Sequence, residues 1–166
     1  MDHEPVHAAN LSVVISAAAL GISLSTFVIS RYRDRRDLLL KVLDRLTTPD
    51  QQAGRRLIHQ LADASPNVDD LTSEQYTLIN NAFAVLNILG IYYRRRYLRR
   101  KDVLALFALN VARVYSDGQA FLSHRRSFAG VTPWPELDGL AEDATAYIQR
   151  HGLGQERTSS PAPLGP

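Results

Sequence analysis

Histidine is the residue type in this sequence most suited to catalysis or metal binding near neutral pH. His59, His124 and His151 lie in three different predicted helices, and none has a second histidine four positions away to place two ligands on one helix face. His3 and His7 do have that spacing, but they lie in a short N-terminal tail that need not be helical. The histidines therefore predict no metal site, no cofactor and no catalytic pair.

The other nucleophilic side chains lack the sequence context that catalysis requires. Cysteine is absent, which excludes disulfides, thiolate metal ligands and cysteine nucleophiles. Serines are numerous, yet the sequence has no GxSxG turn, no SxxK motif and no glycine-rich phosphate loop. We therefore expect that the chain is not an enzyme. The alternative is a hydrolase whose site has no recognisable motif.

The densest charge feature is the segment RRRYLRRK, a basic patch in the second half of the chain. Such a patch binds anionic lipid headgroups, at about 1 kcal/mol for each basic residue near the surface. It also suits nucleic-acid phosphates, because neighbouring tyrosines are available for base stacking. The alternative without a ligand is a solvated helix end, where cations favour the free carbonyl groups. The patch consists of Arg94, Arg95, Arg96, Arg99, Arg100 and Lys101, and the tyrosines are Tyr92, Tyr93 and Tyr97.

These residues must be positioned by the elements around them, of which the first is a long uncharged segment. Residues 6–30 contain no Asp, Glu, Lys or Arg, and residues 11–30 read LSVVISAAALGISLSTFVIS. As a helix, a segment of this length crosses the roughly 30 Å of a bilayer's hydrocarbon core. The pattern predicts one transmembrane helix over residues 11–30. A buried core helix of a soluble bundle is the alternative, although such a helix usually carries a charged residue on its solvent face.

The charges around this segment predict its orientation. No basic residue precedes it, which disfavours a cleaved signal peptide. A juxtamembrane basic cluster follows it, and the positive-inside rule places that side in the cytoplasm of a bacterial inner membrane, with the N-terminus outside. Lipid is then a nearer partner for the basic patch than nucleic acid. The juxtamembrane cluster consists of Arg31, Arg33, Arg35 and Arg36.

Small side chains recur along one face of the predicted span. Ala17, Gly21 and Ser25 are each four residues apart. This spacing lets a second helix approach closely. It predicts a homodimer formed through the transmembrane helix, with a chance occurrence of small residues as the alternative.

Beyond residue 30, apolar periodicity and capping residues predict an all-α chain with a cytoplasmic four-to-five-helix bundle. The first helix continues to about residue 47, and Thr48, as a capping hydroxyl, and Pro49 start a second helix. Thr72 and Gln75 form a capping-box signature before the most apolar helix of the bundle. We expect a tail over residues 1–10, the span over residues 11–30, the helical domain over residues 31–152 and a disordered tail over residues 153–166.

The second half of the bundle is punctuated by glycine and proline. A helix from Lys101 onward is expected to break near Gly118, and a last helix to start at Pro133 or Pro135 and end at Gly152. Trp134 is expected to pack at the entrance of this last helix. Opposite charges predict ion pairs that orient the last helix, each contributing under about 1 kcal/mol if exposed. The charges are those of Arg125 and Arg126 against Glu136, Asp138, Glu142 and Asp143.

The layout of the chain resembles a bacterial family of membrane-anchored helical proteins classed as a domain of unknown function. The resemblance covers residues 11–148 and is carried by one N-terminal span, a basic exit, and the segments FAVLNILGIYYRRRYL, FLSHRRSF and WPELDGLAED. It implies a membrane anchor and a helical domain. Members often carry an acidic residue soon after the apolar run, where this chain has Leu89 and Gly90. A shared acidic site is therefore not expected here. The anchor, the absence of catalytic groups and the two basic patches lead us to expect an interaction or regulatory module on the cytoplasmic face. The alternative is a helical domain that binds nucleic acid or a lipid surface through the basic patch.

Overall fold

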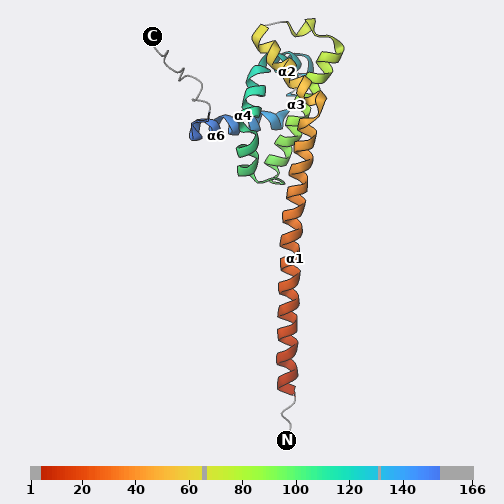
Figure 1. Ribbon diagram of the computed structural model, residues 1–166, viewed down its shortest axis with the longest axis vertical. Coiled ribbons are helices and arrows are strands. Elements are labelled where there is room, and N and C mark those ends of the chain that lie inside the picture. The colour runs from red at the N-terminus through yellow and green to blue at the C-terminus, as the bar shows by residue number, and fades with distance from the viewer. Residues whose placement is uncertain (1–4, 65–66, 131, 154–166) are drawn as a thin grey trace, which may run out of the picture. The chain divides into compact units, whose positions relative to one another are not determined.

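The computed structural model describes residues 5–64, 67–130 and 132–153, except for the side chains of residues 5–15, 17, 18, 64 and 129. These residues form six α-helices and one 3₁₀ turn (Figure 1). No strand occurs among them. The prediction of an all-α chain is confirmed.

The chain divides into two compact units, Met1–Leu40 and Lys41–Pro166. Helix α1 (Pro5–Thr47) forms the described part of the first unit and ends in the second. It begins before the predicted start of the span and ends at the predicted residue. The predicted tail over residues 153–166 lies outside the described residues from position 154 onward.

The transmembrane prediction falls on α1. Among the residues that the structure describes, no helix is both long enough and apolar enough to cross a membrane. The predicted span, residues 11–30, begins in the stretch of α1 whose side chains lie outside the description.

Helix α2 (Pro49–Ala64) follows α1 after a single residue, Thr48. A start at Pro49 agrees with the prediction. The Thr48 hydroxyl, predicted to cap α2, instead donates to the carbonyl of Arg45, because the last carbonyls of a helix have no partner within it. Three further side chains donate to carbonyls at this end of α1: Thr47 to Asp44, Arg55 to Leu46 and Gln52 to Thr47.

Local sequence signals set the remaining helix boundaries. A turn, η1 (Val68–Asp70), precedes α3 (Ser73–Arg94), which opens with the predicted capping box of Thr72 and Gln75. Helices α4 (Arg100–Asp117) and α5 (Gln119–Ala129) are divided at Gly118, as predicted. Helix α6 (Pro135–His151) has proline in its first turn and ends at Gly152, whose φ of 63° is left-handed. Glycine adopts that conformation without steric cost.

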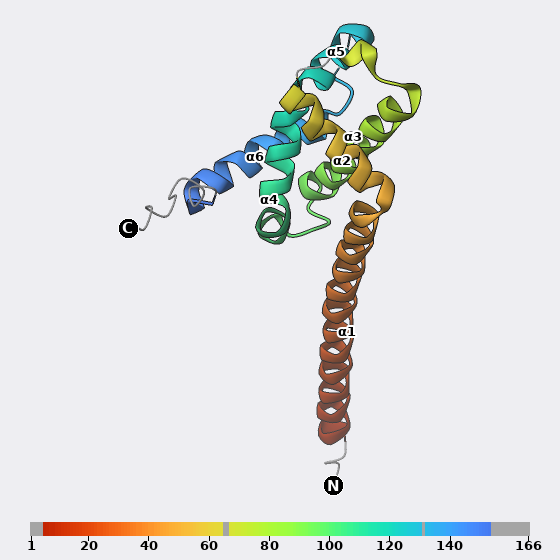
Figure 2. The ribbon, with the colours of Figure 1, turned by 45° about the horizontal axis from the view of Figure 1, so that its top comes forward.

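Within the second unit, α3 packs against α2 and α6, and α4 packs mainly against α6. The α3–α4 connection lies at the opposite end of this bundle from α5 and η1 (Figure 2). The core between the helices is apolar and includes an aromatic group in which Phe83 contacts both Phe121 and Trp134. Trp134 is buried directly before α6, which confirms its predicted position.

Two glycines allow backbones to approach closely around α3. A Cβ atom on Gly90 would lie 2.4 Å from the carbonyl oxygen of Glu136 in α6. A Cβ atom on Gly54 in α2 would lie 2.4 Å from the carbonyl oxygen of Leu78. Both obstructing atoms belong to backbone, so a side chain cannot be accommodated by a change of rotamer. Glycine at these positions sets the spacing of α3 from α2 and α6.

We expect Gly90→Ala to lower the free energy of unfolding by about 1–3 kcal/mol, because the added methyl group overpacks the contact between α3 and α6. Urea denaturation measures this change. Gly139→Ala is the matched control in α6, since a Cβ atom there would meet nothing within 4 Å. It should stabilise the helix by about 0.5–1 kcal/mol. Equal effects of the two substitutions would contradict the role of Gly90.

Candidate functional site

The basic patch lies at the connection between α3 and α4. Arg94 is the last residue of α3, Arg95 caps its C-terminus and Arg99 precedes α4. Leu98 is buried and anchors the connection in the bundle. Arg96 has a φ of 59°, a left-handed conformation that costs roughly 1–2 kcal/mol for a residue with a Cβ atom. The fold therefore holds this loop in one shape.

Two of the six cations are engaged within the bundle. Nη1 of Arg94 donates to both carboxylate oxygens of Glu136 in α6, at 2.8 Å each. This hydrogen bond and the charge of Glu136 raise the pKa of Arg94 above its ordinary value. The guanidinium of Arg100 lies 4.9 Å from the ring centroid of Tyr93, within the range of a cation–π interaction. Arg94 therefore joins α3 to α6, and Arg100 joins α4 to α3.

The other four cations are exposed. Within the described part of the chain, none of them takes part in an ion pair. Tyr97 lies among them, about half-exposed, with its ring 6.2 Å from that of Tyr92. This surface, called the free basic loop below, combines positive charge with one aromatic side chain. It consists of Arg95, Arg96, Arg99 and Lys101 together with Tyr97.

A buried tyrosine next to this loop is held by α6. The hydroxyl of Tyr93 donates to Oδ2 of Asp143 at 2.7 Å. Burial, together with this hydrogen bond and the carboxylate charge, raises the pKa of Tyr93 to about 12. A cavity of about 200 Å³ adjoins the pair and is also lined by Gly90, Arg94 and Arg100. Its charged groups contact one another: Arg94 contacts Glu136, and the Tyr93 ring lies beside Arg100 while its hydroxyl contacts Asp143.

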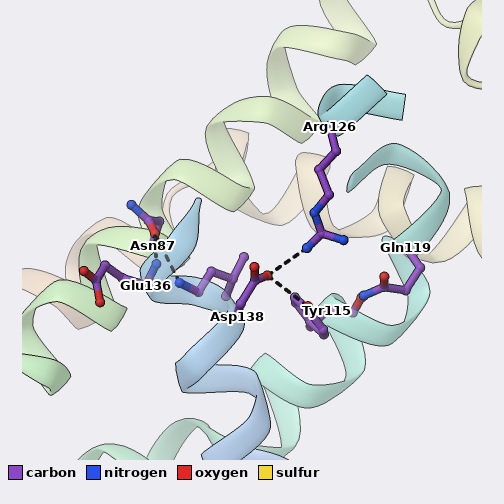
Figure 3. A network of polar contacts seen from close by, with 7 residues as sticks. Asn87, Tyr115, Gln119, Arg126, Glu136 and Asp138 are labelled. Atoms are coloured by element: carbon purple, nitrogen blue, oxygen red, sulfur yellow. Dashed lines mark hydrogen bonds and ion pairs between the residues drawn. The ribbon is translucent and has the colours of Figure 1, made fainter. Parts of the chain in front are cut away.

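A second polar cluster fixes the start of α6 (Figure 3). Oδ1 of Asn87 accepts hydrogen bonds from the backbone N–H groups of Glu136 and Leu137, at 3.1 and 3.2 Å. The side chain of Asn87 thus satisfies two of the free donors at the N-terminus of α6. Oδ1 of Asp138 accepts from the Tyr115 hydroxyl at 2.9 Å and from Nη2 of Arg126 at 3.0 Å. Helices α3, α4, α5 and α6 are therefore joined by polar contacts.

The predicted ion pairing of α6 is confirmed for Arg126, which contacts Asp138. It is wrong for Arg125. This guanidinium lies over the Trp134 ring at 5.7 Å and donates to the Tyr76 hydroxyl at 3.2 Å. The reason is the rotation of about 100° between successive helix residues, which turns Arg125 toward the aromatic group.

The contacts of His59, His124 and His151 are with residues outside the basic patch, and Nδ1 of His151 lies 2.9 Å from the carbonyl oxygen of Tyr147. Nδ1 of His59 in α2 is 2.6 Å from Oδ2 of Asp117 in α4, a contact between residues far apart in sequence. Nε of Arg113 is 3.6 Å from the same oxygen. His124 contacts Asp69 at 3.7 Å. In the described ranges, no three histidine or carboxylate side chains are grouped as metal ligands would be.

No family model, curated protein or solved structure matches the chain. The resemblance to a membrane-anchored helical family stays a prediction.

Two predicted sites lie on α1. The juxtamembrane arginines are exposed except for Arg35, which is half-buried, and Arg31 lies over the Phe27 ring at 5.5 Å. On the small-residue face, the Ser25 hydroxyl donates to the carbonyl of Gly21 at 2.8 Å. The side chain of Ala17 lies outside the description. Both sites stay predictions.

Tyr93 should make stability fall at alkaline pH. Its pKa is higher in the folded chain than the ordinary value of 10.0, so its contribution is complete below that pH and is lost as the pH rises toward 12. We expect a loss of about 1–2 kcal/mol across this window. Urea denaturation at several pH values measures it.

Tyr93→Phe should make this alkaline decline shallower, because the titrating hydroxyl is removed. Tyr97→Phe is the matched control, since Tyr97 is about half-exposed and lies in the same loop region. A decline that Tyr93→Phe leaves unchanged would show that other groups cause it.

Proposed function

We propose that this chain is a single-pass protein of a bacterial inner membrane and that its helical bundle is an interaction module on the cytoplasmic face. In this proposal α1 crosses the membrane over residues 11–30, with the N-terminus outside. The bundle holds partners near the membrane and catalyses no reaction. One observation carries the proposal: the apolar surface of α1.

Six large apolar side chains of α1 are between 54% and 72% exposed. Their spacing spreads them around most of the helix. The remaining arc holds only the hydroxyl residues Ser23, Thr26 and Ser30, so α1 has no charged face along this stretch. Exposure of so much apolar surface to water is unfavourable, at about 25 cal/mol for each Å². A bilayer removes that cost on all sides at once. The six side chains are Leu20, Ile22, Leu24, Phe27, Val28 and Ile29.

The residues after this stretch suit a membrane interface. Tyr32 is exposed directly beyond the apolar segment, and tyrosine is enriched where hydrocarbon meets headgroups. Arg31, Arg33 and Arg36 are also exposed and favour the cytoplasmic side. These charges support the proposed orientation.

A homodimer through the span is part of this proposal. A Cβ atom on Gly21 would meet nothing within 4 Å, so its surface is open to a second helix. The internal hydrogen bond of Ser25 satisfies its hydroxyl without a partner from outside. Both features support close packing of two small-residue faces.

The anchor is tested by fractionation of cells that express the full chain. We expect the chain in the membrane fraction and resistant to alkaline carbonate, and a reporter at the C-terminus active only in the cytoplasm. Leu20→Arg should shift a large share of the chain out of that fraction, because arginine at the centre of a span costs about 3 kcal/mol.

Phe128→Arg in α5 is the matched control, because Phe128 is also an exposed apolar residue but lies outside the proposed span. It should leave the membrane fraction unchanged. Full extraction by carbonate, or a C-terminal reporter active outside the cytoplasm, would contradict the proposal.

The free basic loop is a second candidate site, for anionic phospholipid headgroups. Its four cations have no ion pair in the described part of the chain, and each contributes about 1 kcal/mol near an anionic surface. The proposed anchor would keep the loop close to lipid. Arg94 and Arg100 are excluded from this site because they are engaged in the bundle.

The absence of cysteine allows a single dye at Tyr97→Cys to test this site. We expect a blue shift when the full chain is reconstituted in vesicles that contain phosphatidylglycerol, and little shift in phosphatidylcholine alone. Replacing the four cations of the loop by glutamine should abolish it, and salt should weaken it. A dye at Phe128→Cys is the control. A shift that requires an added oligonucleotide would favour nucleic acid instead.

A further inference from the structure

The outward face of α4 has no use in the function proposed above. Leu106 and Leu109 are 56% and 55% exposed, although Val103, Phe107 and Val111 of the same helix are buried in the bundle. Helix α4 is therefore apolar on two opposite sides. Packing these two leucines against a partner would remove their apolar surface from water, which points to a partner on the outward side.

We infer that this partner is a second copy of the chain, and that two α4 helices pack antiparallel through one outward stripe. The stripe consists of Asp102, Leu106, Leu109 and Arg113. Its residues are spaced by four, three and four positions, so they follow one seam of the helix as in a coiled coil. This stripe shares no residue with the span or with the free basic loop.

The stripe is complementary to itself only in the antiparallel direction. Its two leucines lie at the centre, with the acidic residue at one end and the basic residue at the other. Antiparallel pairing places Leu106 against Leu109 of the second copy and Asp102 against Arg113 of the second copy. Two-fold symmetry forms each of these contacts twice. Parallel pairing would bring like charges together, which is unfavourable.

Asp102 and Arg113 can both pair with a second copy, because neither is held by a strong contact within its own chain. Nε of Arg113 lies 3.6 Å from Asp117, one helical turn away. Arg113 is exposed and Asp117 half-buried, and a pair at this helix spacing contributes about 0.3–0.5 kcal/mol. Asp117 keeps its 2.6 Å contact with His59 if Arg113 turns away. In the described part of the chain, Asp102 has no ion pair.

A single helix face buries less surface than a standard stable interface, so this pairing is weak for chains free in solution. Confinement in one membrane raises the effective concentration of the two stripes. That step rests on the proposed anchor. The stripe itself does not depend on it.

Thiol cross-linking of the full chain in membranes tests the inference. Asn110→Cys places the only cysteine of the chain on an exposed position beside the stripe, where a short bifunctional reagent can join two copies. Asp102→Arg alone and Arg113→Asp alone should each lower the cross-linked yield about fivefold, because each brings like charges together. The two reversals combined should restore the yield, since the opposite charges then face each other again.

Ser123→Cys, at an exposed position of α5, is the control and should give little cross-linking. Circular dichroism and the membrane fraction are measured for every variant. Chains that stay folded and membrane-bound, but whose cross-linking ignores the single reversals or is not restored by the double reversal, would overturn the α4 pairing and leave the anchor intact. Loss from the membrane fraction would instead contradict the anchor.

Discussion

The close approach of α3 to α6 at Gly90 determines how the rest of the bundle is built. Because Gly90 has no side chain, the backbone of α6 at Glu136 lies against α3. This spacing brings Asn87, one turn earlier, within reach of the free N–H groups of α6. It also brings Arg94, one turn later, to the carboxylate of Glu136. The two hydrogen bonds of Asn87 and the ion pair of Arg94 thus depend on the absence of a side chain at Gly90.

The polar contacts of α6 explain which basic residues are paired within the bundle and which are left for a partner. Its carboxylates at Glu136, Asp138 and Asp143 each have an arginine or a tyrosine from another helix. The arginines that they hold are structural. The cations of the free basic loop have no such partners in the described residues. The loop is positive because the carboxylates of α6 contact other side chains. A count of charges in the sequence cannot separate the two groups.

The features predicted from sequence are those that depend on neighbouring residues. Capping at Thr72, the break at Gly118 and the end of α6 at Gly152 follow from local backbone preferences. The contacts of His59 with Asp117 and of Tyr93 with Asp143 join residues far apart in sequence. They depend on how helices pack, which periodicity alone does not give. Arg125 shows the same limit, since its ring contacts depend on the rotation of α5 relative to α3.

The break between α4 and α5 couples two distant positions. A Cβ atom on Gly118 would lie 2.2 Å from Cζ of Phe83 in α3, so the aromatic ring occupies the space that a side chain at position 118 would need. The carbonyl oxygen of Val114 lies 2.9 Å from the same point. A methyl group at position 118 would therefore push the ring of Phe83 against Phe121 and Trp134, so the break between two helices and the centre of the aromatic group share one space.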